Sequence, residues 1–248
     1  MFRRRLIKQQ TGAKTGFRWR GHEISRIEGL SDAVFAFAIT LLVVSLEVPR
    51  TFSELMETMR GFFAFAITFV ILFQVWFAQY LFFRRYALVD AMSVVLNGIL
   101  LFVVLFYIYP LKFLRSLLMN ELQHGSDIVK GHDGKMEPMI EPSQAPLLMT
   151  IYGAGFIAVF GIFALLYGHA YRKRRELGLN EFEIFVTYSG ILPHALNTVV
   201  GMVALLVSLA PLSNPGFASG MVYTIGLPIG HTFLGIYRGR KRRLRFET

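Results

Sequence analysis

Three polar side chains open an apolar stretch of membrane-spanning length, residues 26–49: Arg26, Ser31 and Asp32. A carboxylate inside a membrane-length helix is unfavourable unless it faces protein or water, so Asp32 is suited to hold an ion pair, to border an ion path or to relay a proton. Deeper in the stretch, Thr40 adds a hydroxyl oxygen among large apolar side chains. Arg26 and Asp32 are six residues apart, about 240° around a helix, so a pair between them would form across helices or subunits.

The helix that carries these groups has one continuous stripe. Starting from Arg26, steps of four and three residues place the following side chains on one face, with Leu41 beside Thr40: Leu30, Ala33, Phe37, Thr40 and Val44. A stripe of large apolar side chains with one small polar member can pack a helix bundle or line a pore made by several copies. The spacing alone leaves both possibilities open.

The composition is typical of an all-α, polytopic membrane protein. Of the 248 residues, 54% are hydrophobic and 17% are charged, which is too apolar for a soluble domain of this length. The absence of cysteine excludes a disulfide framework, a thiol nucleophile and a thiolate metal site. The net charge of +10 comes from short basic clusters beside apolar segments, so we expect contact with a lipid bilayer and no nucleic-acid partner.

Six segments are long and apolar enough to cross a bilayer, which takes about 20 residues each. We predict membrane spans at about 24–46, 59–83, 89–114, 146–171, 184–210 and 216–237. The first 23 residues are basic, but the apolar run that follows is too long for a signal peptide. The predicted transmembrane domain therefore covers residues 24–237.

The basic residues orient these segments. Residues 1–26, the turn at 84–85, the loop at 172–175 and the end at 238–248 together hold 20 of the 26 Lys and Arg residues. Because cytoplasmic segments are enriched in these residues, we expect both termini in the cytoplasm. Residues 1–23 are then a basic cytoplasmic segment, residues 238–248 a basic cytoplasmic tail, and residues 118–145 a solvated extracytoplasmic loop.

Further polar side chains lie inside the later spans, where amide groups usually form hydrogen bonds between helices. His194 and Asn197 are three residues apart and share one face of the fifth span, which predicts a packed polar pair or, as the alternative, a proton relay. His231 in the sixth span allows the same two interpretations. The second and third spans contribute Gln74, Trp76, Gln79 and Asn97.

Motifs of common enzymes and of several channel types are missing from the sequence. It contains no phosphate-binding glycine loop, no HExxH and no GxSxG. It also lacks a TVGYG-type filter loop and the arginine ladder of a voltage sensor. We therefore expect no enzymatic activity, no cofactor and no resident metal.

The first span resembles the RxxxFSD signature of the prokaryotic relatives of the endosomal and lysosomal potassium channel family. The matching residues here are Arg26, Leu30, Ser31 and Asp32, followed by AVFAFAITLLV. The resemblance implies six transmembrane helices per subunit, a homotetramer, and a central pore lined by the first helix of each subunit. It also implies a gate and filter made of apolar rings and a threonine ring, which fall here on Phe37, Thr40, Leu41 and Val44.

The sequence departs from the family pattern at three positions. Leu30 stands where Phe is usual, and Phe37 stands where the family usually has Ile or Leu. A histidine often follows the second-helix tryptophan in the family, and the nearest candidate here is the neutral Gln79. The residues expected to hold the pore helix, without contacting the ion, are Arg26, Ser31, Asp32, Trp76, Gln79 and Asn97.

The residues and the resemblance together favour a potassium-preferring cation channel in a prokaryotic plasma membrane, with K⁺ as the permeant ion and copies of the same chain as partners. A proton-coupled secondary transporter that uses Asp32 and His194 is the alternative, and it predicts saturable, pH-dependent flux. A non-conducting membrane scaffold is the third hypothesis, and it predicts a stable oligomer without flux.

Overall fold

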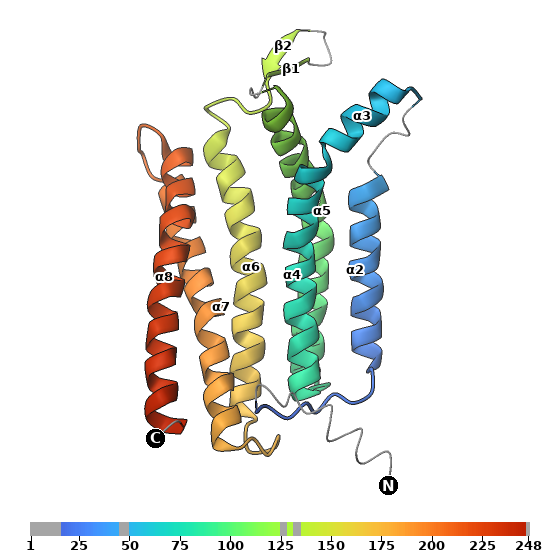
Figure 1. Ribbon diagram of the computed structural model, residues 1–248. Helices are drawn as coiled ribbons and strands as arrows, with labels where there is room; N and C mark the ends of the chain where they lie inside the picture. Colours follow the sequence, from blue (N-terminus) through green and yellow to red (C-terminus); the bar gives the residue numbers. More distant parts are fainter. Residues whose placement is uncertain (1–15, 45–49, 125–127, 131–134, 247–248) are drawn as a thin grey trace.

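The computed structural model describes residues 16–44, 50–124, 128–130 and 135–246, which form a bundle of long, roughly parallel helices (Figure 1). A short helix, α3 (Phe52–Arg60), and an antiparallel hairpin of β1 (Ile128–Lys130) and β2 (Met136–Pro138) lie at one end of the bundle. The long helices are α2 (Arg26–Val44), α4 (Phe62–Tyr86), α5 (Ala91–His124), α6 (Ala145–Arg172), α7 (Glu181–Ser208) and α8 (Pro215–Phe246).

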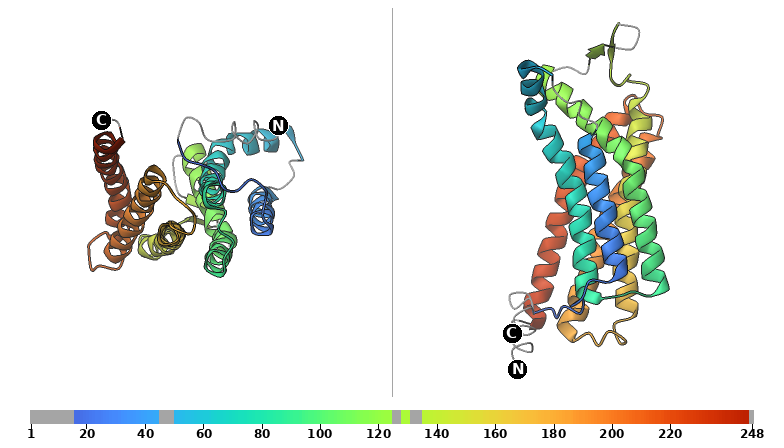
Figure 2. Two further views of the ribbon diagram at one scale, coloured as in Figure 1. Left: turned by 90° about the horizontal axis from the view of Figure 1, so that it is seen from below. Right: turned by 90° about the vertical axis from the view of Figure 1, so that its right-hand side faces the viewer.

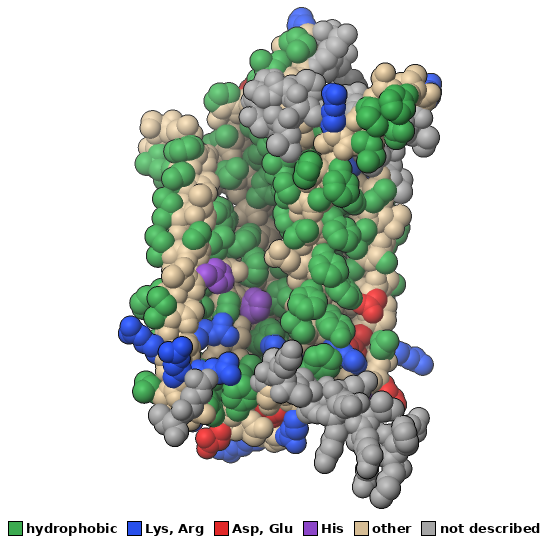
Figure 3. All heavy atoms as spheres, viewed as in Figure 1, with side chains coloured by type: hydrophobic (Ala, Val, Ile, Leu, Met, Phe, Trp, Pro, Cys, Tyr) green, Lys and Arg blue, Asp and Glu red, His purple; other side chains and the backbone are tan. Residues whose placement is uncertain are grey.

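Four of these helices, namely α4, α5, α6 and α7, are long and apolar enough to cross a membrane. Many large apolar side chains face outward from the bundle, and Figure 3 shows them covering its middle part. Helix α2 is shorter and carries Arg26, Glu28 and Asp32 in its first two turns. Helix α8 has a lower mean hydropathy because it contains several glycines and a basic C-terminal end. The chain is therefore a mostly helical, multi-pass membrane protein.

The long helices pack in two groups. Helices α2, α4 and α5 contact one another, α6, α7 and α8 contact one another, and α5 joins the groups by packing against α6. Seen from one end in Figure 2, α2 lies at one edge of the bundle, and α7 and α8 lie at the other. This arrangement leaves one side of α2 without a covering helix.

Aromatic side chains join the two groups. Phe82 and Tyr86 of α4 pack against Tyr167 of α6, with ring centroids 5.5 and 5.8 Å apart, and all three rings are buried. The Tyr86 hydroxyl also donates a hydrogen bond to Thr187 Oγ1 of α7 at 2.9 Å. Each aromatic pair of this kind contributes about 0.5–1.5 kcal/mol beyond the burial of its area. These contacts hold α4 against α6 and α7 and fix its position along the axis of the bundle.

Two helices extend beyond their predicted limits. Helix α5 continues to His124 and so enters the region expected to be an extracytoplasmic loop. Helix α8 continues to Phe246, through most of the expected basic tail. The tail stays helical because Phe246 packs against Phe182 and Phe185 of α7, with ring centroids 5.4 and 5.5 Å apart. Basic side chains of the tail also lie over aromatic rings of α7, Lys241 over Tyr188 and Arg242 over Phe182, so the tail packs along α7.

Several basic clusters meet at one end of the bundle. The segment 16–25 and the ends of α4, α6 and α8 lie together there, opposite the β hairpin (Figure 1). Figure 3 shows most of the visible Lys and Arg side chains at this end. We call it the basic end. The clusters predicted at 84–85, 172–175 and 238–245 thus lie on the same side of the apolar zone.

Candidate functional site

Helix α2 begins with a capping box, a signal that apolar periodicity alone does not reveal. The Ser25 hydroxyl accepts a hydrogen bond from the Glu28 backbone N–H at 3.3 Å, and Glu28 Oε2 accepts one from the Ser25 backbone N–H at 2.8 Å. These reciprocal bonds satisfy free N–H groups of the first turn and start the helix at Arg26. At the other end, Arg115 of α5 donates to the Leu42 carbonyl at 3.4 Å, where a cation also suits the helix dipole.

The predicted stripe lies on the uncovered side of α2. Leu30 and Phe37 are 59% and 56% exposed, and Ala33 and Thr40 are exposed as well. The opposite face packs against α4 and α5. That buried face consists of Ser31, Phe35, Ala38 and Leu42. The chain by itself therefore leaves the stripe open to a partner, to lipid or to water.

The hydroxyl of Thr40 presents an oxygen on this uncovered side. Thr40 Oγ1 donates its proton to the Ala36 carbonyl at 2.9 Å, so its lone pairs remain free to accept a hydrogen bond or to contact a cation. The neighbouring Leu41 is half-buried and packs against the core of the bundle. Val44 ends α2, and its side chain lies outside the part that the structure describes. Among the predicted gate and filter positions, Phe37 and Thr40 are thus the two clearly exposed ones.

Polar contacts tie α2 to α4 and α5 at one level of the bundle. Trp76 Nε1 of α4 donates a hydrogen bond to Asp32 Oδ1 at 2.8 Å. Behind it, Asn97 of α5 donates to Ser31 Oγ at 2.9 Å and accepts from Gln79 Nε2 of α4 at 3.1 Å. Ser31, Gln79 and Asn97 are 0%, 1% and 1% exposed. Five of the six residues predicted to hold the helix therefore come together.

The sixth residue, Arg26, stands apart. It is exposed at the start of α2 and has no hydrogen bond or ion pair within the described ranges. Because Asp32 is turned to Trp76, Arg26 and Asp32 do not pair within one chain, and a pair across subunits stays a prediction. The described side chains also contain no cluster of three His, Asp or Glu residues suited to a metal ion.

The histidines of α7 and α8 take separate partners. His231 Nε2 of α8 lies 2.7 Å from Asn197 Oδ1 of α7, so Asn197 pairs with α8 and not with His194 on its own helix. His194 stacks on aromatic rings of α6, including Phe163 at a centroid distance of 5.2 Å. Its helix belongs to the group of α6, α7 and α8, whereas Asp32 belongs to the other group. The structure therefore does not bring together Asp32 and His194, the two side chains that the transporter hypothesis requires.

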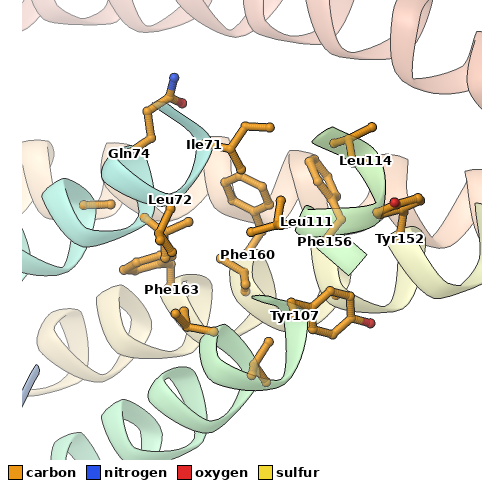
Figure 4. Close-up of a pocket in the computed structure, with 16 residues that line it drawn as sticks. Ile71, Leu72, Gln74, Tyr107, Leu111, Leu114, Tyr152, Phe156, Phe160 and Phe163 are labelled. Carbon is orange, nitrogen blue, oxygen red and sulfur yellow. The ribbon is translucent and has the colours of Figure 1, made fainter. Parts of the chain in front are cut away.

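An apolar cavity of about 490 Å³ lies between α4, α5 and α6. Figure 4 shows Phe156, Phe160 and Phe163 of α6 around it with Tyr107 of α5, while the Gln74 amide points away from the apolar side chains. Such a lining suits a hydrocarbon group and not an ion. The described lining residues come from α4, α5 and α6, so this cavity is separate from the stripe on α2.

A buried carboxylate that the sequence reasoning missed holds the segment before α2. The side chain of Glu183, in the first turn of α7, is 0% exposed. Its Oε2 accepts from Arg20 Nη2 at 2.8 Å, and its Oε1 accepts from the Arg18 backbone N–H at 2.9 Å. Glu183 also forms a capping box with Asn180. The Asn-x-x-Glu spacing was a readable signal for the cap, but the basic partners lie 163 and 165 residues away along the chain.

A second missed anchor is Asp90, in the turn between α4 and α5. Its Oδ1 accepts from the Ser93 backbone N–H at 3.2 Å, and its Oδ2 lies 2.6 Å from His169 Nε2 and 3.1 Å from Lys173 Nζ. Burial alone would raise the pKa of Asp90, but hydrogen bonds from Ser93, His169 and Lys173 hold that pKa well below its usual range. The ionised carboxylate therefore fastens this turn to the end of α6.

The segment that carries the stripe and the polar contacts matches a family model. Residues 26–107, from the start of α2 into α5, match the family described as endosomal/lysosomal potassium channel TMEM175. This range contains every residue predicted for the gate, the filter and the polar network. Helices α6, α7 and α8 lie outside it.

One relative covers nearly the whole chain, and a second covers more than half of it. A protein of Marivirga tractuosa named potassium channel is 38% identical over 244 residues, which are 97% of this chain and 98% of the relative. A potassium channel of Chamaesiphon minutus is 30% identical over 163 residues, or 62% of this chain and 70% of the relative.

Solved structures show the same fold. The crystal structure of a variant of the potassium channel MtTMEM175, in complex with a nanobody–MBP fusion protein, matches with a TM-score of 0.78 at 38% identity over 89% of this chain and 96% of that chain. A lysosomal potassium-selective channel TMEM175 homolog from Chamaesiphon minutus matches in fold, with a TM-score of 0.50 at 23% identity. The relative that aligns along almost its entire length, together with the family match over α2, shows that this chain belongs to the endosomal/lysosomal potassium channel TMEM175 family.

Proposed function

We propose that this chain is one subunit of a homotetrameric, potassium-preferring cation channel in which α2 of each subunit lines a central pore. The observation that carries the proposal is the uncovered side of α2, where Asp32 and Thr40 are exposed beside Leu30 and Phe37. The relatives named potassium channels, and the family match over the same helix, support K⁺ as the permeant ion.

The charge on this side of α2 favours water over lipid as its covering. A carboxylate of a membrane helix that faces hydrocarbon is unfavourable, by about 2.5–3.5 kcal/mol at the helix centre and by less nearer the helix ends, where Asp32 lies. Asp32 has one described hydrogen-bond donor, the neutral Trp76 indole, which offsets only part of that cost. A water-filled pore hydrates the rest of the carboxylate. Phe37 alone would suit contact with lipid, but the whole stripe, with Asp32 beside it, suits a water-filled pore shared by the subunits.

The same face supplies the elements of a gate and a filter. In this proposal Phe37 forms the narrowest apolar ring, Thr40 forms a ring of hydroxyl oxygens, and Leu41 and Val44 form further apolar rings. An apolar ring close to the width of a bare ion makes dehydration unfavourable and closes by dewetting. Because K⁺ is hydrated less strongly than Na⁺, K⁺ passes such a ring at a lower cost. The free lone pairs of Thr40 then offset part of the lost hydration.

We infer six membrane crossings, with α2 and α8 added to the four helices that qualify by length and apolarity. The pore accommodates the charged start of α2, and packing on α7 supports α8. The basic end then faces the cytoplasm of a prokaryotic cell, with both termini on that side of the plasma membrane. The β hairpin and the end of α5 face the opposite side.

Potassium flux from proteoliposomes of the purified protein tests the proposal, with sodium and a large organic cation as comparisons. A channel gives rapid, non-saturating K⁺ flux that exceeds Na⁺ flux. If the wild type is silent, Phe37→Ala should open the pore, and Phe233→Ala, at an exposed position of α8, is its control. Saturable, pH-dependent flux would favour the transporter, and continued silence of a stable oligomer would favour the scaffold.

Thr40→Ala tests the assignment of the filter. Its matched control is Thr232→Ala on α8, because Thr232 is also exposed and makes the same backward hydrogen bond, to Pro228 at 2.7 Å. If the Thr40 ring favours K⁺ over Na⁺ by about 1 kcal/mol, its removal lowers the permeability ratio about fivefold. An unchanged ratio in Thr40→Ala would remove this residue from the filter.

A further inference from the structure

The cavity between α4, α5 and α6 is long and narrow. Its lining extends from Val103 to Leu114 along α5 and from Tyr152 to Phe163 along α6, and each of these stretches rises about 16 Å. A volume of about 490 Å³ over that length gives a mean width of about 6 Å. A helix with its side chains is about 10–12 Å wide, so a helix of a second copy does not fit. The shape suits one flexible chain.

The lining offers no polar group to a ligand. The described lining residues include no charged side chain. Their tyrosines use their hydroxyl protons within the bundle, because Tyr107 donates to the Ile151 carbonyl and Tyr152 donates to the Pro110 carbonyl, both at 2.8 Å. The Gln74 amide points away from the apolar side chains (Figure 4). An apolar cavity of this kind stays dry, so a hydrocarbon is the chemistry that fills it.

The cavity opens on the outer surface of the bundle. Its lining residues Ile71 and Gln74 are exposed near the middle of α4, whereas Leu72 and Phe163 lie deeper and are 2% and 1% exposed. Helices α4 and α6 are both long and apolar enough to cross a membrane, so the opening lies at the depth of the hydrocarbon core. Figure 3 shows the bundle hollowed between α4 and α8, with apolar side chains around the hollow. Acyl chains of the bilayer therefore lie at the opening.

We propose that this cavity binds one acyl chain of a membrane phospholipid, which enters between α4 and α6 and packs against Leu72 and Phe163. The chain is recognised by its shape and by the apolar lining, so the headgroup does not decide binding. A bound chain supports α4 from the side opposite its hydrogen bond to α2, which Trp76 donates to Asp32. The site is separate from the pore proposed on α2 and does not depend on it.

Photo-crosslinking of the full-length protein in liposomes tests the proposal. The probe is phosphatidylcholine with a diazirine on one acyl chain, and fragment mass spectra locate the residues that the chain contacts. We expect labelling of the buried Phe163 as well as of Leu165, which is 56% exposed on α6 and serves as the reference for lipid around the bundle. Phosphatidylglycerol with the same labelled chain should label Phe163 to the same extent.

Variants that fill the cavity should exclude the chain. Val159→Trp places an indole in the cavity, so the ratio of Phe163 to Leu165 labelling should fall about tenfold, because a close-packed interior has no room for both groups. Val203→Trp is the matched control, because Val203 is 45% exposed on α7 and does not line the cavity. Its ratio should not change.

Ala78→Phe fills the cavity from α4 and should act as Val159→Trp does, so that the result does not depend on the folding of one variant. Size-exclusion chromatography checks that each variant keeps the oligomer of the wild type. The proposal is overturned if the wild type is not labelled at Phe163, as when a side chain of a second copy fills the cavity. It is also overturned if both filling variants keep the wild-type ratio, or if the two headgroups give unequal labelling of Phe163.

Discussion

The link between Asn97, Ser31 and Gln79 yields a prediction whose size can be worked out from the structure. Asn97 is 1% exposed and joins α5 to α2 and to α4 through hydrogen bonds of 2.9 and 3.1 Å. Hydrogen bonds between membrane helices contribute about 0.6 kcal/mol on average and at most about 1.7 kcal/mol. Asn97→Ala removes two of them and leaves the buried Gln79 amide without its partner, which costs about 1–3 kcal/mol more. We therefore expect a loss of about 3 kcal/mol.

The neighbouring positions provide internal controls. Ser31→Ala should cost less than Asn97→Ala, because it removes one bond to α5. In the Asn97→Ala background the hydrogen bond to Ser31 is already absent, so Ser31→Ala should cost less there than in the wild type. A double-mutant cycle should therefore show a coupling energy of about 0.6–1.7 kcal/mol. Gln74→Ala is the matched amide control, because Gln74 is exposed and makes no hydrogen bond to the described residues. Its effect should stay within about 0.5 kcal/mol.

The assay is thermal unfolding of the detergent-purified protein, with size-exclusion chromatography to confirm an unchanged oligomer. For a chain of this size, 3 kcal/mol corresponds to about 6–12 °C in melting temperature. If Asn97→Ala melts together with Gln74→Ala and the cycle shows no coupling, the Asn97 contacts do not anchor α2. The reasoning that places α2 through this buried polar chain would then be refuted.

Three further predictions concern the other anchors. Glu183→Gln removes a fully buried anion from its pair with the partly exposed Arg20, so we expect a loss of about 3 kcal/mol and faster tryptic cleavage after Arg20, whereas the exposed Glu181→Gln should change neither. Asp90→Asn should lower the melting temperature equally from about pH 5 to 8, because a lowered pKa adds stability above the unfolded-state value of about 3.9. The difference in melting temperature between the wild type and Asp90→Asn should disappear as the pH falls through the still lower pKa of Asp90 in the folded protein. A difference that grows in acid would contradict this assignment. Trp76→Phe keeps a ring but removes the donor to the carboxylate on α2, so unfolding should show a loss of about 1.5 kcal/mol, and an unchanged melting temperature would mean that water replaces the indole.

Local signals in the sequence were sufficient for the class of the protein and for the rough positions of its long helices. A bilayer-length apolar run is recognisable because no water is available to satisfy exposed backbone groups inside a membrane. The clustering of Lys and Arg likewise predicted which segments would share an end. Helix limits were less accurate, because caps and single packing contacts decide them. The capping box at Ser25 was readable, whereas the contact of Phe246 with α7 was not.

The sequence by itself determined that α2 combines an acidic start with a stripe of apolar residues and one threonine, and this pattern carries the family resemblance. It could not decide which side of α2 would stay uncovered, because the buried face with Phe35, Ala38 and Leu42 is as apolar as the stripe. Only the packing of α2 against α4 and α5 settled that. Only the tertiary structure, too, brought Glu183 to Arg20. The physical reason is common to both cases: periodicity describes the neighbours of a residue on its own helix, whereas burial and charge pairing depend on helices that are distant in the chain.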